Sequence, residues 1–455
     1  MEATRTSTHN SNFDAIHPPE KKHIDECVHC GFCLPACPTY LLGGDEMDSP
    51  RGRIYLIKGA AEGQVPVDKT FRDHIDHCLG CMACMTACPS GVRYDRLIEP
   101  TRGQIERKLK RSWSEALFRK LIFATFPYAS RLRVLKIPLR LYQQSGLQSL
   151  VRRSNLLSVL PRMSAMEALL PRIRRGQSKR IPAFVLAEGT RRMRVALLSG
   201  CVQQVFFSHV NAATVRVMAA EGCDVIIPPN QPCCGALMLH SGLNEQGIAL
   251  AKRLIETFED VDADAIVINS AGCGSTVKEY GILLRDDPVW ARRASAFAAK
   301  CKDVSEILAD LAPRKTRQEL KLRVAYHDAC HLQHAQRVYE QPRRLLSEIP
   351  GLEVAEIPES SLCCGSAGVY NLLQPDAANQ LGDRKVENLM TTNADAVVSA
   401  NPGCLLQLMN GLRRRGMKAI PTFHMVELID ASIRGISAEQ LTGGDEGLHS
   451  NQAEN

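Results

Sequence analysis

The chain has 455 residues, of which 45% are hydrophobic and 23% are charged, and its formal net charge is +7 at pH 7. At roughly 100 to 200 residues per domain this length allows about three domains, and the composition excludes a disordered chain, a collagen and a coiled-coil rod. No apolar run reaches the roughly 18 residues of a membrane-spanning helix, and the first residues are too polar for a secretory signal. We therefore expect a cytoplasmic protein.

The first part of the chain carries two cysteine groups with the same spacing. Polar residues dominate positions 1–20, which we predict to be a disordered tail. Residues 21–104 follow and contain the pattern C-x-x-C-x-x-C-x-x-x-C-P twice. In the bacterial iron–sulfur run of this spacing, the first three thiolates bind one cluster and the fourth binds the other cluster. The predicted ligand sets of two 4Fe-4S clusters are Cys27, Cys30, Cys33 and Cys88, and Cys78, Cys81, Cys84 and Cys37.

A pair of structural zinc sites is the alternative for these groups, but zinc needs neither the third C-x-x-C step nor the Cys-Pro pair. Gly31, Gly80 and Gly91 allow backbone amides to approach the cluster sulfides. The stretch SPRGRIYLIKGAAEG between the groups has helical rather than hairpin character. Residues 21–104 are therefore predicted to form an α-helical ferredoxin domain that transfers electrons, since neither group leaves an open iron or a general base for substrate chemistry.

Residues 105–192 are predicted to form a basic helical linker. Apolar residues recur there at three- and four-residue steps, and prolines are expected to break the helices at Pro127, Pro138, Pro161 and Pro171. Between positions 102 and 194 the chain has 22 Lys and Arg against 4 Asp and Glu. Aromatic residues are mixed with these cations, which favours contact with an anionic membrane surface or a partner over nucleic acid. A solvated face of ordinary amphipathic helices is the alternative.

From residue 193 onward, apolar runs of strand length alternate with amphipathic helices, and this pattern occurs twice. Equivalent cysteines lie 129 to 131 residues apart, which indicates a duplicated domain. The copies are predicted over residues 193–318 and 319–436, each as an α/β domain with a mainly parallel sheet. Helices are expected near 211–221, 245–260, 339–348 and 376–390, and closing helices at 303–308 and 424–429. Residues 437–455 are predicted to be a second disordered tail.

Each copy contains one cysteine, a Cys-Cys-Gly triplet and a further cysteine, and each of these follows an apolar strand. Ligands bind at the carboxyl ends of parallel strands, so the four cysteines of one copy are expected to converge. Gly235 and Gly365 supply the turn that two adjacent cysteines at a strand end need. Buried inert thiols are the alternative. The candidate metal ligands are Cys201, Cys233, Cys234 and Cys273, and Cys330, Cys363, Cys364 and Cys404.

Zinc or a further iron–sulfur cluster is the expected metal of these sets. Three histidines near the second set, His327, His331 and His334, are candidate ligands or proton carriers, with a structural role as the alternative. Cys223 and Cys301 have no partners at ligand spacing and are predicted to be structural.

The segments CVHCGFCLPACPTY, DSPRGRIYLIK, SAGCGSTVKEYG and LCCGSAGVYNLLQPD together resemble the iron–sulfur subunit of bacterial glycolate oxidase, over about residues 20 to 436. The layout is also similar to that of heterodisulfide reductase and anaerobic glycerol-3-phosphate dehydrogenase subunits. The resemblance implies FAD-binding partner subunits that oxidise glycolate to glyoxylate, and a quinone-type acceptor. It implies an electron-transfer subunit that is not catalytic alone and that associates peripherally with the inner face of the cytoplasmic membrane.

The sequence departs from the fullest form of the Cys-Cys-Gly repeat, which ends in C-x-x-C and holds an unusual cluster in heterodisulfide reductases. Ser270 and Asn401 stand where that form has its penultimate cysteine. A five-cysteine noncubane centre and disulfide chemistry are therefore not expected. No G-x-G-x-x-G opens a helix, so FAD is expected on the partner subunits only. The same role in a lactate or glycerol-3-phosphate dehydrogenase complex is one alternative; an iron–sulfur nucleic-acid-binding regulator is another, although no recognition helix is visible.

Overall fold

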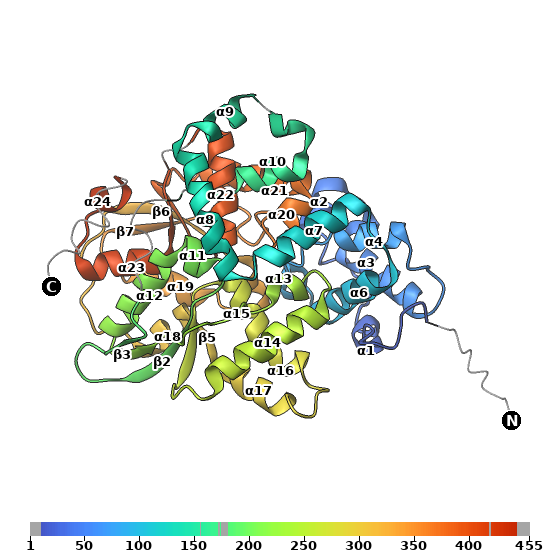
Figure 1. Cartoon of the computed structure of the whole chain (residues 1–455), viewed down its shortest axis with the longest axis horizontal. Coiled ribbons are helices and arrows are strands. Elements are labelled where there is room, and N and C mark those ends of the chain that lie inside the picture. The colour runs from blue at the N-terminus through green and yellow to red at the C-terminus, as the bar shows by residue number, and fades with distance from the viewer. Residues whose placement is uncertain (1–10, 155, 172, 174–180, 418–419, 444–455) are drawn as a thin grey trace.

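The computed structural model describes residues 11–154, 156–171, 173, 181–417 and 420–443 (Figure 1). The amino-terminal part consists of short helices around a small core that includes Ile57, Phe71 and Leu97. Ser49 caps the start of the helix at Pro50–Ala61 by accepting a hydrogen bond from the Gly52 amide at 3.0 Å. The elements are α1 (Lys21–Asp25), α2 (Pro38–Gly43), η1 (Glu46–Asp48), α3 (Pro50–Ala61), α4 (Lys69–Asp76), α5 (Ala83–Thr86) and α6 (Asp95–Lys108).

Part of the segment predicted as an amino-terminal tail is packed. Phe13 is buried and its ring lies 6.3 Å from that of Phe71, centroid to centroid. The Asp14 carboxylate accepts hydrogen bonds from Arg107 and Gln104, both on α6. The prediction of a loose tail is therefore wrong for residues 12–14, because one aromatic anchor and one ion pair fix them, whereas positions 1–10 lie outside the described residues.

The linker helices run from the ferredoxin part across the remaining domains (Figure 1). Pro127 and Pro161 lie at helix ends as expected, but α8 continues through Pro138. Val134, four residues earlier, is 69% exposed, so solvent is available where the proline cannot donate a backbone hydrogen bond. The elements are α7 (Trp113–Thr125), α8 (Ala129–Gln144), α9 (Leu147–Ser154), η2 (Leu156–Val159) and α10 (Pro161–Ala168).

The first Cys-Cys-Gly domain contains a five-stranded sheet in the order β1-β3-β2-β4-β5, parallel except for β1. Its strands are β1 (Phe184–Val185), β2 (Met193–Leu198), β3 (Cys223–Ile226), β4 (Ala265–Ile268) and β5 (Cys301–Asp303). Its helices are α11 (Gln203–Phe206), α12 (Ser208–Ala220), α13 (Ala236–Leu239), α14 (Asn244–Glu259), α15 (Ala271–Lys278), α16 (Tyr280–Leu283), α17 (Ala291–Lys300) and α18 (Val304–Leu311).

The second Cys-Cys-Gly domain repeats this arrangement with a parallel sheet in the order β7-β6-β8-β9. Its strands are β6 (Leu322–His327), β7 (Leu352–Glu356), β8 (Ala396–Ser399) and β9 (Thr422–His424). Its helices are η3 (a π-helical turn, His331–Ala335), α19 (Glu340–Ser347), α20 (Tyr370–Leu373), α21 (Pro375–Met390), α22 (Pro402–Arg414), α23 (Met425–Arg434) and α24 (Ala438–Thr442).

The shared strand order confirms the predicted duplication and the mainly parallel sheets. The closing helices α18 and α23 occupy equivalent positions, and each begins with a capping box, Asp303 with Glu306 and His424 with Glu427. Apolar residues of both sheets form one continuous core, so the two domains are packed against each other. No helix among the described residues is both long and apolar enough to cross a bilayer.

The predicted carboxyl-terminal tail also begins with structure. Ser437 Oγ accepts a hydrogen bond from the Gln440 amide, and the Gln440 side chain accepts one from the Ser437 amide. This reciprocal cap forms α24, so the prediction of a tail from residue 437 is wrong for the described residues up to 443. Positions 444–455 lie outside the described residues.

Candidate metal centres

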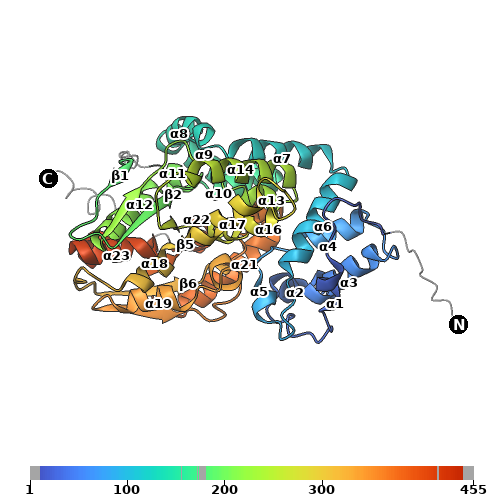
Figure 2. The ribbon, with the colours of Figure 1, turned by 90° about the horizontal axis from the view of Figure 1, so that it is seen from below.

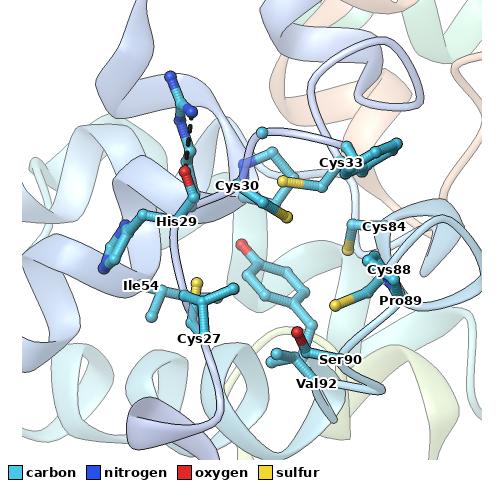
Figure 3. A pocket seen from close by; sticks show the side chains of 16 residues that line it. Cys27, His29, Cys30, Cys33, Ile54, Cys84, Cys88, Pro89, Ser90 and Val92 are labelled. Atoms are coloured by element: carbon cyan, nitrogen blue, oxygen red, sulfur yellow. Dashed lines mark hydrogen bonds between the residues drawn. The ribbon is translucent and has the colours of Figure 1, made fainter.

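The four cysteines of the first predicted ferredoxin set line a single pocket (Figure 3). Cys27, Cys30 and Cys33 come from the loop between α1 and α2, and Cys88 comes from the turn after α5, more than fifty residues later. Cys84 of the other set also reaches this pocket. The pocket thus brings together two segments that lie far apart in the sequence.

Left-handed backbone conformations wind the first loop around this pocket. His29 has φ = 56° and Gly31 has φ = 89°. The positive φ of Gly31 favours a glycine, and a Cβ there would also lie 2.8 Å from Nη1 of Arg51 and displace that side chain. Arg51 fixes the loop by donating from Nη1 to the His29 carbonyl at 3.1 Å and from Nε to Glu46 at 2.6 Å.

The second ferredoxin set lies in the interior. All four of its cysteines are buried: Cys37, Cys78, Cys81 and Cys84. Burial raises the pKa of Cys84, and neighbouring thiolates, first among them that of Cys81, add to the effect. Four ionisable thiols gathered in an apolar interior are costly as thiolates unless a cation neutralises their charge. The donor set therefore has the composition that an iron–sulfur cluster requires.

Neighbouring cations and hydrogen bonds favour the thiolate of Cys78. Burial opposes its ionisation, yet its pKa is lowered, because the charges of Arg53 and Arg102 and a hydrogen bond from the Gly80 amide, 3.4 Å from Sγ, outweigh that effect. The Tyr94 hydroxyl also donates to Cys78 Sγ at 3.6 Å. Tyr94 lines the first pocket too, so its side chain lies between the two ligand sets.

Arg53, Arg102 and Tyr94 are the functional residues that sequence reasoning missed. Arg53 is only 1% exposed although it occupies an ordinary helical position in α3. Arg102 donates to the backbone carbonyls of Cys78 and His240, which joins the ferredoxin part to the first Cys-Cys-Gly domain. No local pattern distinguishes these arginines from surface residues, since their partners lie elsewhere in the chain.

The four cysteines of the first repeat converge as predicted. Sγ of Cys201 lies 3.4 Å from Sγ of Cys233, and Cys234 is hydrogen-bonded to both Cys233 and Cys273. Hydrogen bonds from these two thiols are the main reason why the pKa of Cys234 is lowered well below the usual value. The Tyr280 hydroxyl donates to the Cys234 carbonyl at 2.6 Å and holds the triplet in place.

The triplets do not end their strands, and this part of the prediction is wrong. Strand β3 ends at Ile226, and the loop that carries Cys233 contains Pro228 and Pro229, which cannot donate to a strand ladder. The turn at the glycines is as expected, with φ = 77° at Gly235 and 87° at Gly365. A Cβ on either glycine would collide with a backbone carbonyl, so no other residue fits.

The second repeat brings its four cysteines together with one histidine. Sγ of Cys363 lies 3.9 Å from that of Cys330, and Cys364 is hydrogen-bonded to Cys363 and Cys404. One potential ligand atom from each of His327, Cys364 and Cys404 lies within 4.8 Å of the others. Of the three candidate histidines, His327 is therefore the one placed among thiols.

The other two histidines connect domains. Nε2 of His331 donates to the Gly80 carbonyl at 3.0 Å, inside the loop between two ferredoxin cysteines. His334 is hydrogen-bonded to Thr86 Oγ1 at 2.7 Å and donates to the Ser361 carbonyl. Burial lowers the pKa of His331 to about 4, so this ring is neutral at pH 7.

The second ferredoxin set adjoins the second repeat. Cys81 and Cys363 belong to one apolar cluster together with Leu79, Tyr370 and Leu381. Burial and, next, the nearby thiolate of Cys330 raise the pKa of Cys81 well above its usual value. Figure 2 shows the ferredoxin helices set against the end of the domain pair where α16 and α21 lie. The first pocket, the second set and the second repeat thus follow one another in space.

Cys223 and Cys301 form no hydrogen bond with the cysteines of the four sets among the described residues. Cys223 is fully buried in β3, and Cys301 begins β5 and donates to the Phe297 carbonyl at 3.3 Å. Burial raises the pKa of Cys223 to about 11, so this thiol stays protonated at neutral pH.

The fold and the cysteine sets define an iron–sulfur protein with a ferredoxin-like domain, a linker and two cysteine-rich domains. Family models match each part: a 4Fe-4S dicluster domain at residues 23–92, the linker region of the glycolate oxidase iron–sulfur subunit at 114–170, and cysteine-rich domains at 195–278 and 324–409. The chain belongs to the family of glycolate oxidase iron–sulfur subunits.

Three relatives illustrate this membership. The probable glycolate oxidase iron–sulfur subunit of Bacillus subtilis is 41% identical over 421 residues, covering 90% of this chain and 95% of the relative. The glycolate oxidase iron–sulfur subunit of Escherichia coli is 34% identical over 415 residues, covering 90% and 93%. Lactate utilization protein A of an Exiguobacterium species is 32% identical over 241 residues, covering 53% of this chain and 98% of that protein.

Proposed function

We propose that this chain is the electron-transfer subunit of a membrane-associated complex that oxidises glycolate to glyoxylate, and that it passes electrons from a flavoprotein subunit to a quinone-type acceptor. The observation that carries the proposal is the meeting of Cys27, Cys30 and Cys33 with the distant Cys88 in one pocket. This is the ligand arrangement of two-cluster ferredoxins, in which bound 4Fe-4S clusters accept and release single electrons.

The two ferredoxin cysteine sets differ in exposure, which favours docking of the partner at the first set and storage of charge at the second. Cys30 is exposed, and the loop that carries it presents Val28 and Phe32, which are 69% and 65% exposed, so this face is suited to dock the flavoprotein. The second set is shielded from water, and Arg53 and Arg102 supply the positive charge that offsets its thiolates. In this proposal the chain holds the clusters and the partner holds FAD and binds glycolate.

The cysteines of the two repeats are proposed as further metal ligands. In each repeat, sulfur atoms lie within hydrogen-bonding distance of one another, at 3.4 Å for Cys201 and Cys233 and 3.9 Å for Cys330 and Cys363. Four thiols collected in this way suit zinc or an iron–sulfur cluster.

The linker is proposed to lie on the inner face of the cytoplasmic membrane. Val134, Ile137 and Leu141 share one face of α8 and are 69%, 68% and 63% exposed. Trp113 and Leu117 are similarly exposed on α7, in a segment rich in Lys and Arg. Exposed apolar side chains among cations are the composition of interfacial helices that bind anionic lipids.

The test is reconstitution with the flavoprotein subunits. Anaerobically purified chain alone should show cluster absorbance but no flavin and should not be reduced by glycolate, whereas glycolate should bleach that absorbance once the flavoprotein is added. A Val28→Asp/Phe32→Asp variant should slow this reduction and leave the absorbance unchanged. Flavin on the isolated chain together with unaided glycolate oxidation would contradict the proposal.

A second candidate is the same role in a lactate-oxidising complex. It is favoured by the similarity to lactate utilization protein A over half of the chain. The same reconstitution distinguishes glycolate from lactate as the substrate. With the flavoprotein that co-purifies, bleaching of the cluster absorbance by lactate but not by glycolate would favour the lactate-oxidising complex.

A further inference from the structure

The two cysteine sites of the duplicated domains differ at one buried position. His327 ends β6, three residues before Cys330, and Leu198 ends β2, three residues before Cys201. Both side chains are buried, with 1% and 2% exposure. The duplication thus placed an apolar side chain beside the first site and an imidazole beside the second.

The imidazole of His327 lacks a hydrogen-bond partner on one nitrogen. Nδ1 is buried and makes no hydrogen bond among the described residues. A buried polar atom left unpaired destabilises the folded chain, so a nitrogen of this kind calls for a partner. A potential ligand atom of His327 lies within 4.8 Å of the sulfur atoms of both Cys364 and Cys404, and a metal ion held by these sulfurs is within its reach.

A hydroxyl is also available to support a metal-bound ring. A ligating histidine normally donates its other N–H to an oxygen, which fixes the orientation of the ring. Ser399 pairs with His327 in the register of β6 and β8, and its buried hydroxyl has no hydrogen-bond partner in the part of the chain that the structure describes. The first repeat has Ile268 at the position of Ser399 and cannot provide this support.

We propose that His327 is a metal ligand, and that the second repeat holds a thiophilic metal centre of mixed imidazole and thiolate ligation while the first repeat offers thiolates alone. Cys364 and Cys404 share the metal with His327, and one thiolate of the neighbouring pair Cys330 and Cys363 completes a set of four ligands. Imidazole with thiolates suits both zinc and the iron of a cluster. This inference rests on the proposed metal role of the repeats.

The effect of His327 on the site depends on whether the metal is zinc or the iron of a cluster. A zinc centre of this composition would stabilise the second domain without changing oxidation state. An iron–sulfur centre in which a neutral imidazole replaces a thiolate carries less negative charge, and its reduction potential is higher than that of an all-thiolate centre.

The test compares metal content and ligation in the full-length chain, purified anaerobically with iron, sulfide and zinc supplied. His327→Leu gives the second repeat the side chain of the first and should lose the metal of the second repeat. His327→Cys supplies another soft ligand and should retain it. His424→Gln removes a second fully buried imidazole from the end of β9 in the same sheet, outside the thiol group, and should also retain it.

Spectroscopy of the wild-type chain identifies the atoms that bind the metal of the second repeat. If the metal is zinc, its X-ray absorption fine structure should contain imidazole scattering that disappears in His327→Leu. If it is iron, pulsed electron paramagnetic resonance should show coupling to imidazole nitrogen that is lost in the same variant. Sulfur-only ligation, a wild-type metal content in His327→Leu, or metal-free repeats would each overturn the proposal.

The signals of the ferredoxin clusters are recorded in the same samples. Persistence of the ferredoxin signals in His327→Leu shows that this variant is folded. If the leucine variant is unstable, the metal content of His327→Cys still tests whether a ligand is needed at this position. A chain that lacks ferredoxin clusters but has a His327-dependent metal would contradict the electron-transfer function and support the ligand, so the two proposals fail separately.

Discussion

Ser270 and Asn401 face each other across the boundary between the two Cys-Cys-Gly domains, with the Ser270 hydroxyl donating to Asn401 Oδ1 at 3.4 Å. They are the two residues that replace the penultimate cysteine of the fullest repeat. Asn401 Oδ1 also accepts from the Gly272 amide at 3.3 Å, and its Nδ2 donates to Cys404 Sγ at 3.4 Å. Positions that could have ligated metal instead join one domain to the other.

Substitution of Asn401 should therefore weaken the domain pair. Asn401→Ala leaves the Gly272 amide without its acceptor, and we expect a loss of about 1 to 3 kcal/mol in the free energy of unfolding, measured by urea denaturation. Asn401→Asp keeps the acceptor for Gly272 but places a negative oxygen near Cys404, so it should mainly reduce the metal content of the second repeat. Equal stability of the alanine variant and the wild type would contradict this interpretation.

The crosswise ligand sets predict which substitutions behave alike. Cys88→Ser and Cys30→Ser should remove the same electron paramagnetic resonance signal from the reduced chain, because both residues line the first pocket. Cys37→Ser and Cys81→Ser should remove the other signal. A Cys88→Ser spectrum that matches Cys81→Ser would show that each cysteine group binds its own cluster.

Removal of the buried cation of α3 should destabilise the ferredoxin domain. Arg53 pairs with Asp48 at 3.2 Å and donates to Thr39 Oγ1 and to the His74 carbonyl. Arg53→Met should cost about 3 to 5 kcal/mol, because it removes the buried cation from the partly buried Asp48 carboxylate, which keeps only its contacts with His74 and His77. Arg72→Met, which removes an arginine that pairs with a carboxylate at the surface, should cost less than about 1 kcal/mol. Urea denaturation followed by circular dichroism measures the free energy of unfolding of both variants. Similar losses in the two variants would contradict the greater importance of the buried arginine.

The cap of α18 should make stability depend on pH. Burial raises the pKa of Asp303 from 3.8 to about 6, and its Oδ2 has no hydrogen-bond partner among the described residues. The folded chain therefore holds this proton more tightly than the unfolded chain, so stability falls as the pH rises from about 4 to 6. Asp303→Asn cannot ionise and still accepts from the Ser305 amide.

We expect Asp303→Asn to match the wild type at pH 4 and to be more stable by on the order of 2 to 3 kcal/mol at pH 8. Urea denaturation across this pH range is the measurement. Asp310→Asn, at an exposed carboxylate of the same helix, is the control and should change little at any pH. A gain for Asp303→Asn that does not vary with pH would contradict the raised pKa.

The linker surface predicts binding to anionic vesicles. The full chain should sediment with phosphatidylglycerol vesicles but not with phosphatidylcholine vesicles, and salt should release it. Ile137→Glu/Leu141→Glu should weaken binding about tenfold or more, since each buried apolar side chain contributes about 1.5 to 3 kcal/mol. Val289→Glu, an exposed site on the first repeat, should have no effect. Salt-independent binding to both lipids would count against the proposed surface.

Local patterns in the sequence predicted most of the elements in the duplicated domains. The helices expected at 245–260 and 376–390 are α14 (Asn244–Glu259) and α21 (Pro375–Met390). The apolar period of about 3.6 residues and the constant spacing of the cysteines are both properties of short segments. The two prolines after β3 are also a local signal that the strand ends before the triplet.

Contacts between distant segments could not be predicted in the same way. The hydrogen bond from His331 to the Gly80 carbonyl joins residues 251 positions apart. Arg53 occupies an amphipathic helix where most arginines face water, and its burial depends on Asp48 and Thr39 in neighbouring elements. The meeting of Ser270 with Asn401 follows from how two similar domains pack together, which neither repeat encodes alone.

The burial of the second ferredoxin set beneath the second repeat has a consequence for maturation. All four of its cysteines are buried, and Cys81 shares an apolar cluster with Tyr370 and Leu381 of the second repeat, so docking of the domains restricts the access of the cellular machinery that delivers iron and sulfide. We therefore expect the cluster to be loaded before the domains dock. A chain that closes while iron is scarce would be trapped with a vacant inner centre, and only partial opening of the molecule would allow its repair.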